Sequence, residues 1–388
     1  MRGHIVQRSK KKGTYSIKIS LGKDATGKYK YQWFTVQGSK KDAQKKLSEI
    51  LHQKDNGTFM KPGNTTVSDY LQKWLTDYAR PNISPRGFER YQGIINQHFT
   101  PAFGGLVLTQ LKPEHLQKHY TETLNSGLSA STVRIHHAVI HKALEIAVEW
   151  GMIGRNIADA VKPPRITRIE MNTWNEDEVN RFLEASKDNQ YYALFYTALF
   201  TGMRRSELLA LRWQDIDFIY SQIYVSRSLH HLKDGSYVYT QPKSEKSRRT
   251  IALPPSAFLT LSEYRKQRET EAALMDKTLK DDGLVFSTLG KPFRPNTITR
   301  AWQTLAAKAG VKVIRLHDAR HTHASLMLKQ GIHPKVVQER LGHASIQMTL
   351  DIYSHVAPGI QEAAAESFDK LLIQELHKSE VAKLYIQE

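Results

Sequence analysis

The sequence has no cysteine among its 388 residues. Disulfide frameworks, iron–sulfur clusters, thiolate zinc sites and cysteine nucleophiles are therefore excluded, and a cytoplasmic location is expected. The longest strongly apolar stretch, Tyr191 to Met203, is shorter than the roughly 20 residues that a membrane-spanning helix needs, which excludes a transmembrane protein. No apolar segment follows the basic start, MRGHIVQRSKKKG, so we expect no secretory signal.

Acidic residues are few compared with basic ones. The chain has 56 Lys and Arg against 38 Asp and Glu, a net charge of +18. The excess is uneven, because residues 1–46 hold 13 Lys or Arg but only two acidic residues, Asp24 and Asp42. A solvated basic surface is the ordinary alternative, but this asymmetry favours a polyanionic partner, and therefore nucleic acid.

The length and the linker composition predict a multidomain α+β protein. One compact core cannot fill 388 residues. Segments 55–64 and 162–173 are rich in Gly, Pro or Asn and are typical of linkers. They delimit three predicted domains, 1–58, 65–161 and 174–388. The second is expected to be all-α, and the third mostly helical with a small antiparallel sheet, because helical apolar spacing dominates both.

The first domain is predicted to be a small three-stranded sheet followed by a helix. Apolar alternation marks strands at 14–21 and 28–36, and Ser39 is placed to cap a helix over 40–53. In the second strand the aromatic residues Tyr29, Tyr31 and Trp33 share one face, and Lys28, Lys30 and Gln32 share the other. We expect one face to pack on the helix and the other to present cations, an arrangement by which β-ribbons enter DNA grooves.

The third domain combines many predicted helices with one predicted sheet. A hairpin of strands 222–230 and 236–240 surrounds the turn KDG, and a strand at 248–253 is expected to continue its sheet. A capping box of Asn175 and Glu178 predicts a helix start. Further helices are predicted over residues 257–274, 295–309, 318–330, 334–341 and 345–355.

The turn TGMRRSE places two arginines, Arg204 and Arg205, at the start of a predicted helix. Cations are unusual there, because the helix dipole prefers anions at this end. Guanidinium and backbone N–H groups together could hold a phosphate at such a turn. An equally good explanation is a buried structural ion pair with Glu207.

Three later segments also carry candidate chemistry. Lys243 lies in a basic turn between predicted strands, where it could protonate a leaving oxygen or simply be solvated. His317 and Arg320 are one helical turn apart and would project the same way. His343 follows Leu-Gly, and Tyr353 follows ten residues later on a predicted helix. A single helical tyrosine most often serves packing, so each segment alone is ambiguous.

A metal site is the competing interpretation of the segment HDARHTH. His317 and His321 have i, i+4 spacing, and His323 is near. The helical zinc motif, however, needs Glu as a base at the position of Asp318, and the charge of Arg320 would repel a divalent cation. We therefore expect no metal and no cofactor.

The four segments, taken in order and spacing, resemble the tyrosine recombinase or phage-integrase family. Arg204 and not Arg205 matches the family arginine, because of its position relative to Thr201, Gly202 and Glu207. Lys243 is preferred over Lys246, because it starts the stretch leading into the next strand. The positions that match the family's catalytic residues are Arg204, Lys243, His317, Arg320, His343 and Tyr353.

The resemblance implies a site-specific DNA recombinase, the integrase of a phage or conjugative element. Tyr353 would attack a phosphodiester and form a 3′-phosphotyrosine. Arg204 and Arg320 would hold the phosphate, Lys243 would protonate the 5′-oxygen, and the two histidines, His317 and His343, would bond the phosphate and move the tyrosine proton. Residues 1–58 resemble the arm-type DNA-binding domain of the family and residues 65–161 its core-binding domain.

The partners implied are double-stranded DNA at core and arm sites, and a homotetramer that exchanges strands through a Holliday junction. Candidate accessory partners are an excisionase and a host DNA-bending protein. The tail after Pro358 could pack on its own subunit or on a neighbour. The rival functions are a type IB topoisomerase-like nicking-closing enzyme, which the arm-like domain disfavours, and a non-catalytic DNA-binding accessory protein, which the complete set of six residues disfavours.

Overall fold

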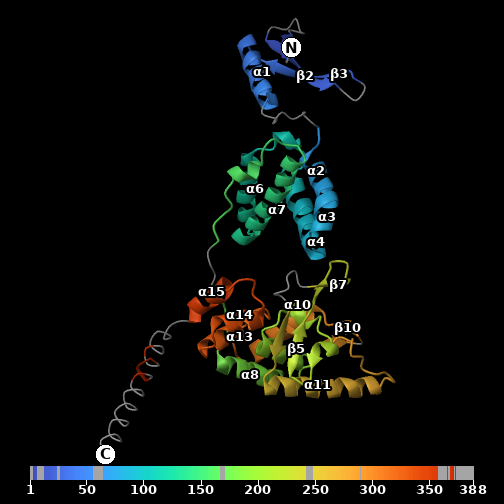
Figure 1. Cartoon of the computed structure of the whole chain (residues 1–388), viewed down its shortest axis with the longest axis vertical. Helices are drawn as coiled ribbons and strands as arrows, with labels where there is room; N and C mark the ends of the chain where they lie inside the picture. The colour runs from blue at the N-terminus through green and yellow to red at the C-terminus, as the bar shows by residue number, and fades with distance from the viewer. Residues whose placement is uncertain are drawn as a thin grey trace, which may run out of the picture. The chain divides into compact units, whose positions relative to one another are not determined.

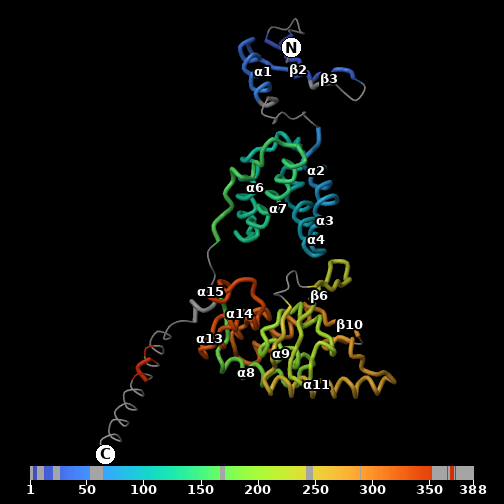
Figure 2. The backbone as a smooth tube through the Cα atoms, in the orientation of Figure 1, coloured from blue at the N-terminus to red at the C-terminus, as the bar shows by residue number. Residues whose placement is uncertain are grey.

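The structure is a computed structural model of the chain. It describes residues 3–6, 13–23, 27–55, 64–166, 171–241, 248–288, 290–356, 365, 368–370 and 372. The chain divides into two compact units, Met1–Thr167 and Arg168–Glu388, whose elements are labelled in Figure 1 and traced in Figure 2. Helices dominate and every sheet among these residues is small and antiparallel, which confirms the predicted fold class. Within the described ranges, each helix is too short or too polar to cross a bilayer.

The first unit begins with a three-stranded antiparallel sheet of order β1-β2-β3, as predicted. Its elements are β1 (Gly3–Val6), β2 (Thr14–Lys23), β3 (Tyr29–Gln37) and helix α1 (Lys40–Asp55). The strand β1 was not located by the sequence pattern. Ser39 caps α1 as predicted, because its Oγ accepts a hydrogen bond from the Asp42 backbone N–H at 3.2 Å.

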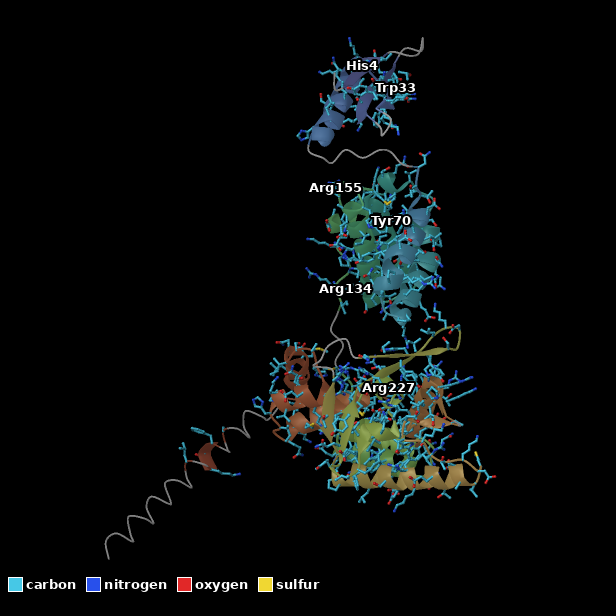
Figure 3. All side chains as sticks on the ribbon, turned by 45° about the vertical axis from the view of Figure 1, so that its right-hand side comes forward. His4, Trp33, Tyr70, Arg134, Arg155 and Arg227 are labelled. Carbon is cyan, nitrogen blue, oxygen red and sulfur yellow. The ribbon has the colours of Figure 1, made fainter. Side chains whose placement is uncertain are left out.

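The exposed face of this sheet carries the aromatic residues of β3. The expectation that the exposed face would be the one with Lys28 and Lys30 is therefore corrected. Tyr31 and Trp33 are 47% and 37% exposed, and the ammonium of Lys18, on the neighbouring strand, lies 3.8 Å from the ring centroid of Tyr31. The apolar stripe of α1 is covered by the other face, where Ile17 and Phe34 pack. The rings therefore face solvent together with a cation. Figure 3 labels Trp33 among the side chains of this sheet.

The rest of the first unit is all-α, as predicted. Its helical elements are α2 (Val67–Trp74), the π-helix η1 (Leu75–Ala79), α3 (Arg80–Asn82), α4 (Pro85–Ile94), the π-helix η2 (Ile95–Phe99), α5 (Thr100–Phe103), the 3₁₀-helix η3 (Leu108–Gln110), α6 (Pro113–Asn125), α7 (Ala130–Glu149) and the 3₁₀-helix η4 (Ile157–Ala160). The apolar spacing in α2 predicts its buried face correctly, since Val67, Tyr70, Leu71 and Trp74 are all fully buried.

A cluster of histidines lies inside this helical region. His119 and His136 are buried, and the Nε2 atom of His119 is 3.3 Å from the Nδ1 atom of His136. The ring of His98 lies 4.5 Å from that of His136. Burial, and then the charge of neighbouring histidines, lowers the pKa of both His119 and His136 to about 4. The pair is therefore neutral at physiological pH.

These lowered pKa values predict that acid destabilises the helical region. In the unfolded chain each histidine titrates near 6.5, so the unfolded state binds more protons than the folded state as the pH falls from 6.5 towards 4. The free energy of unfolding should fall by on the order of 5 kcal/mol over this window, because each of the two histidines contributes about half of that amount. Urea unfolding at several pH values measures it. The variant His119→Gln/His136→Gln cannot titrate there, and an equal pH dependence in both proteins would contradict the assignment.

The second unit holds most of the remaining helices. They are α8 (Glu176–Ser186), α9 (Tyr192–Thr201), α10 (Arg205–Leu208), the 3₁₀-helix η5 (Trp213–Asp215), α11 (Pro255–Ala273), α12 (Pro295–Lys308), α13 (Asp318–Lys329), α14 (Pro334–Leu341) and α15 (Gln347–Val356). The predicted capping box at α8 is confirmed, because Asn175 Oδ1 accepts from Glu178 N at 2.8 Å and Glu178 Oε2 accepts from Asn175 N at 2.9 Å.

The strands of this unit form separate small sheets instead of the single predicted one. They are β4 (Ile216–Asp217), β5 (Gln222–Val225), β6 (Ser228–His231), β7 (Tyr237–Thr240), β8 (Arg249–Ala252), β9 (Ser287–Thr288) and β10 (Lys291–Pro292). The predicted strand 222–230 is interrupted at Arg227, whose Nε donates to the carbonyl of Ala210 at 2.8 Å. As a result β8 pairs with β5, and β6 pairs only with β7.

An aromatic core fixes the helices that carry the candidate site. The ring of Trp302 in α12 stacks on Trp174 at 4.9 Å and contacts Phe182 of α8 at 4.3 Å. The backbone N–H of Trp174 donates to Thr322 Oγ1 in α13 at 3.2 Å. Burial of such large rings supplies much of the hydrophobic stabilisation, and it holds α13 in a defined position.

Candidate active site

The first component of the candidate site is the turn that follows helix α9. Gly202 is the C-cap of this helix. This residue has a left-handed φ of +63°, and a Cβ atom there would lie 2.4 Å from Leu341 Cδ2 and 2.9 Å from His323 Cδ2. Only glycine fits both the backbone conformation and the contact. The turn therefore lies directly against α13 and the end of α14.

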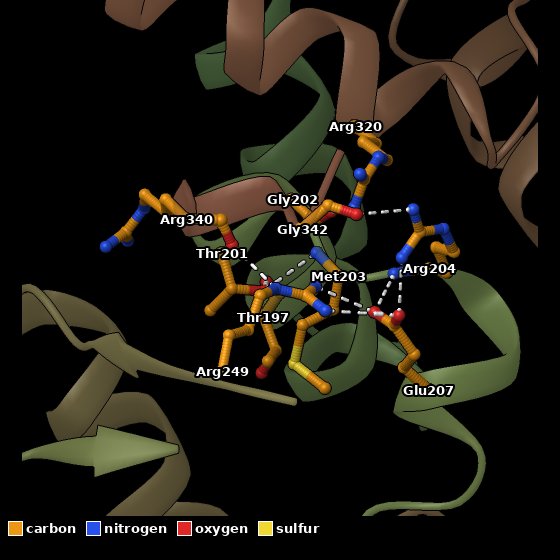
Figure 4. Close-up of polar contacts among 10 residues, drawn as sticks. All are labelled: Thr197, Thr201, Gly202, Met203, Arg204, Glu207, Arg249, Arg320, Arg340 and Gly342. Carbon is orange, nitrogen blue, oxygen red and sulfur yellow. Dashed lines mark hydrogen bonds and ion pairs between the residues drawn. The ribbon is translucent and has the colours of Figure 1, made fainter. Parts of the chain in front are cut away.

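Arg204 follows this turn at the N-cap of α10. Its Nη1 atom donates to Glu207 Oε1 at 2.8 Å, and its Nη2 atom donates to the carbonyl of Gly342 at 3.0 Å (Figure 4). The side chain stays 33% exposed. Arg205 instead bonds Thr299 Oγ1 at 3.0 Å, so the two adjacent arginines have different surroundings.

Glu207 is the buried carboxylate on which this arrangement depends. Besides Arg204, it binds Arg249 of β8 with both oxygens, at 3.2 and 2.8 Å, and only 5% of its surface is exposed. Burial alone would raise the pKa of Glu207, but the hydrogen bond and charge of Arg249, followed by the charge of Arg204, lower it to about 2. The ion pair suggested by the sequence is thus present, and it orients Arg204 as well.

Arg320 contributes a second guanidinium from the first turn of α13. It is 3% exposed, and its Nη1 atom donates to the carbonyl of Gly202 at 2.9 Å. Its Nη2 atom is buried and has no hydrogen-bond partner among the described residues. Burial, and then the charges of Arg204 and Arg249, lowers the pKa of Arg320 to about 9, so it remains protonated at pH 7. A buried donor without a partner is costly, which makes this atom a site for an external acceptor.

His343 follows a second left-handed glycine, Gly342, at the end of α14. The imidazole is buried, and its Nδ1 atom lies 2.9 Å from Thr349 Oγ1 in α15. Burial, and then the charges of Arg320 and Arg204, lowers the pKa of His343 to about 3. The ring is therefore neutral in the free protein and can accept a proton or a hydrogen bond.

His317 and His321 lie at the start of α13. The side chain of His317 is exposed and its ring is 5.4 Å from that of His321. Desolvation by the surrounding protein, and then the neighbouring charges, lowers the pKa of His317. The Nδ1 atom of His321 is buried and lacks a partner among the described residues. The carbonyl of His317 accepts from the backbone N–H of Arg320 at 3.2 Å, which ties the two predicted site residues together.

The structure thus brings together three of the six predicted residues, Arg204, Arg320 and His343, with His317 one turn from Arg320. Tyr353 lies on α15, which packs on α13 and α14, and only its backbone is described. Lys243 and its competitor Lys246 lie outside the described residues.

The competing metal site is not formed by the residues proposed for it. His323 uses Nδ1 to contact the carbonyl of Leu199 at 2.8 Å, and its Nε2 atom accepts from Arg340 Nε at 3.1 Å, so neither nitrogen is available as a ligand. In the part of the chain that the structure describes, no three His, Asp or Glu side chains are grouped so that they could hold a metal ion.

Sequence reasoning missed several residues that support this site. No motif in the sequence singles out Arg249, Arg340 or Thr349. An arginine inside a short strand, such as Arg249, and one in the last turn of a helix, such as Arg340, are common on protein surfaces. Their positions in the sequence therefore do not indicate that they support a site. Their long-range bonds, such as that from Arg249 to Glu207 across 42 positions, become visible only in the fold.

Two family models match this chain, and together they cover more than half of it. The model described as "Phage integrase family" matches residues 172–359, and "Phage integrase, N-terminal SAM-like domain" matches residues 66–124. The chain therefore belongs to the phage integrase family, and it is a tyrosine site-specific recombinase.

Relatives of nearly the same length support this membership. A "Tyrosine recombinase XerC-like" protein of Caldanaerobacter subterraneus subsp. tengcongensis is 29% identical over 378 residues, covering 92% of this chain and 96% of the relative. The ICEBs1 integrase of Bacillus subtilis is 28% identical over 366 residues, covering 93% and 98%.

Two solved structures share the fold. The Tn1549 transposon integrase in complex with a circular intermediate DNA gives a TM-score of 0.66 at 22% identity, covering 79% of this chain and 99% of that one. A lambda integrase tetramer bound to a Holliday junction gives 0.56 at 18% identity, covering 88% and 92%.

Proposed function

We propose that this recombinase integrates and excises a mobile element by cleaving and rejoining DNA through a 3′-phosphotyrosine. The observation that carries the proposal is the buried Nη2 atom of Arg320, which has no partner among the described residues. The charge of Arg204 lowers the pKa of Arg320, and the charge of Arg320 lowers the pKa of His343, so the three side chains share one site. Two guanidiniums held on buried scaffolds suit the charge that develops on the non-bridging oxygens of a phosphate under attack.

The chemical step needs no external energy source. The phenolic oxygen of Tyr353 attacks phosphorus, the bond from phosphorus to the 5′-oxygen breaks, and the 3′-phosphate becomes esterified to the tyrosine. The energy of the phosphodiester is kept in the new bond, so a 5′-hydroxyl can reverse the step. Lys243 donates a proton to the leaving 5′-oxygen in this scheme.

The histidines handle the proton of the nucleophile. A phenol with a pKa of about 10 is a weak nucleophile at pH 7, so its proton must be removed. His343 is neutral in the free protein, and a bound phosphate would favour its protonated form by adding negative charge beside it. His317 is proposed to bond the phosphate from the start of α13.

The proposed partners are inferred from the net positive charge of the chain and from its similarity to integrases whose structures contain DNA. Residues 65–161 and 174–388 would hold the core site, and residues 1–58 the arm sites. The protein would act in the cytoplasm as a homotetramer on two duplexes, with an excisionase and a host DNA-bending protein setting direction. The related structures of the Tn1549 transposon integrase bound to a circular intermediate DNA and of a lambda integrase tetramer bound to a Holliday junction support this assembly.

The test of the function is a nicked suicide duplex carrying the DNA that flanks the gene. Without metal or ATP, the wild-type protein should form a covalent complex that survives SDS and shifts on a gel. Relaxation of any supercoiled plasmid without site preference would favour the topoisomerase-like alternative. Tight, specific binding with no covalent band, even with host extract added, would favour the non-catalytic accessory protein.

Removing residues 1–58 should abolish protection of distal arm sites and leave the core-site footprint unchanged. The exposed rings and Lys18 of the first sheet would be lost, and these groups offer stacking and charge to DNA. DNase footprinting measures both sites. Lys18→Gln should weaken arm binding, whereas Lys46→Gln, which replaces an exposed lysine of α1 paired with Glu49, is the control. Unchanged arm footprints in the truncated protein would overturn the domain assignment.

A further inference from the structure

A second layer of side chains lies behind Arg204 and Arg320. Its members are Arg249 on β8, His323 on α13 and Arg340 on α14. None of them is among the residues proposed to touch DNA, and each contacts one of the two glycine turns or the chain beside it. We infer that His323 and Arg340 are positioning residues, which fix the spacing of Arg204 and Arg320 for strand transfer.

Arg340 is the centre of this layer, because its one guanidinium joins four elements. Its Nη2 atom donates to the carbonyl of Phe200 in α9 at 3.0 Å, its Nη1 atom to the carbonyl of Ala252 in β8 at 3.0 Å, and its Nε atom to His323 Nε2 in α13 at 3.1 Å. Its own carbonyl accepts from Arg249 Nε at 2.7 Å. The planar guanidinium of arginine can donate these three hydrogen bonds at the same time, and the ammonium group of a lysine cannot.

His323 must be one particular tautomer for this layer to form. Arg340 can only donate, so Nε2 of His323 is the acceptor and Nδ1 carries the hydrogen that points to the carbonyl of Leu199. Burial, and then the charge of Arg340, lowers the pKa of His323 to about 3, which keeps the acceptor free at neutral pH. The ring therefore links the end of α9 to the end of α14 through two directed bonds.

The layer reaches the phosphate-binding arginines through the two glycine turns. A Cβ atom on Gly202 would lie 2.9 Å from His323 Cδ2, and one on Gly342 would lie 3.1 Å from Arg249 Cδ, so both turns rest on this layer. The carbonyl of Gly202 binds Arg320, and the carbonyl of Gly342 binds Arg204. A shift of α14 relative to α9 would thus change the distance between the two guanidiniums.

The inference rests on the proposed function, and its test separates it from a general loss of stability. His323→Phe keeps the size of the ring but removes both directed bonds, whereas His323→Gln retains one donor and one acceptor. Single-turnover cleavage of the suicide duplex at saturating DNA should be about 10- to 100-fold slower for His323→Phe, with DNA affinity within about twofold of wild type. His323→Gln should recover most of the rate.

A substrate with a methylphosphonate at the scissile position supplies the decisive readout. One non-bridging oxygen is then an uncharged methyl group, so precise placement of both arginines matters less. The difference between wild type and His323→Phe should shrink severalfold on this substrate. Arg340→Lys should behave like His323→Phe, and Arg268→Lys, in the Arg268–Glu271 pair of α11, should cleave like wild type.

Each alternative result has a defined meaning. Equal rates for wild type and His323→Phe, or an equal loss on both substrates without recovery in His323→Gln, would overturn the positioning role and leave the proposed function intact. Absence of cleavage by the wild-type protein would overturn the proposed function and this inference with it.

Discussion

Replacing Tyr353 by phenylalanine is expected to abolish the covalent protein–DNA product and to leave DNA binding unchanged. The change removes a single oxygen, the proposed nucleophile. The start of α15 should keep its place, because Thr349 is fully buried and its Oγ1 atom lies 2.9 Å from His343 Nδ1. Cleavage should fall by at least about 10⁴-fold, as for other lost nucleophiles. An SDS gel with the suicide duplex measures the product, and a mobility shift measures binding.

The matched control for this experiment is Tyr220→Phe. Tyr220 is 72% exposed in the turn between β4 and β5, so the same chemical change there should leave cleavage at the wild-type level. A covalent product formed by Tyr353→Phe would show that another side chain is the nucleophile. Loss of product in both variants would point to a damaged preparation and call for repetition with refolded protein.

Replacing Arg204 by lysine is expected to slow cleavage by about 10²- to 10³-fold, nearly as much as replacement by alanine. The guanidinium already gives Nη1 to Glu207 and Nη2 to the carbonyl of Gly342, and it still has donors for a phosphate. A lysine ammonium is a single point that cannot serve these three directions together. Single-turnover cleavage at saturating DNA measures the loss.

Arg212→Lys is the structural control for this prediction. Arg212 also pairs with a carboxylate three residues later, Asp215, at 2.8 Å, and it is 25% exposed. The variant should therefore lose a similar local ion pair and still cleave at a rate near that of wild type. Equal losses in both variants would assign Arg204 a structural role only, and a wild-type rate in Arg204→Lys would remove it from the phosphate site.

The sequence predicts elements best where a local rule decides the structure. The capping box of Asn175 and Glu178 and the cap at Ser39 involve neighbours three residues apart, and both form as predicted. The buried face of α2 follows from apolar spacing alone. The motifs around Arg204 and His343 predict their turns, because a left-handed φ at Gly202 and at Gly342 requires glycine.

The failures concern choices that depend on distant residues. Alternation shows that Tyr31 and Trp33 share a face of β3, but the packing of α1 decides which face meets solvent. The break at Arg227 comes from its bond to the carbonyl of Ala210, 17 positions away. The partners of Arg340 lie 17, 88 and 140 positions away, so no window of the sequence contains this layer.

The buried Nη2 atom of Arg320 lowers the stability of the free protein, and the same atom is proposed to bind the phosphate during catalysis. In the free protein this donor has given up its water without gaining a partner among the described residues, so it lowers the free energy of unfolding. A bound phosphate would repay that cost, and DNA would then act as a folding ligand for its own enzyme. Selection for heat resistance alone would favour losing this arginine, and only selection for recombination would retain it.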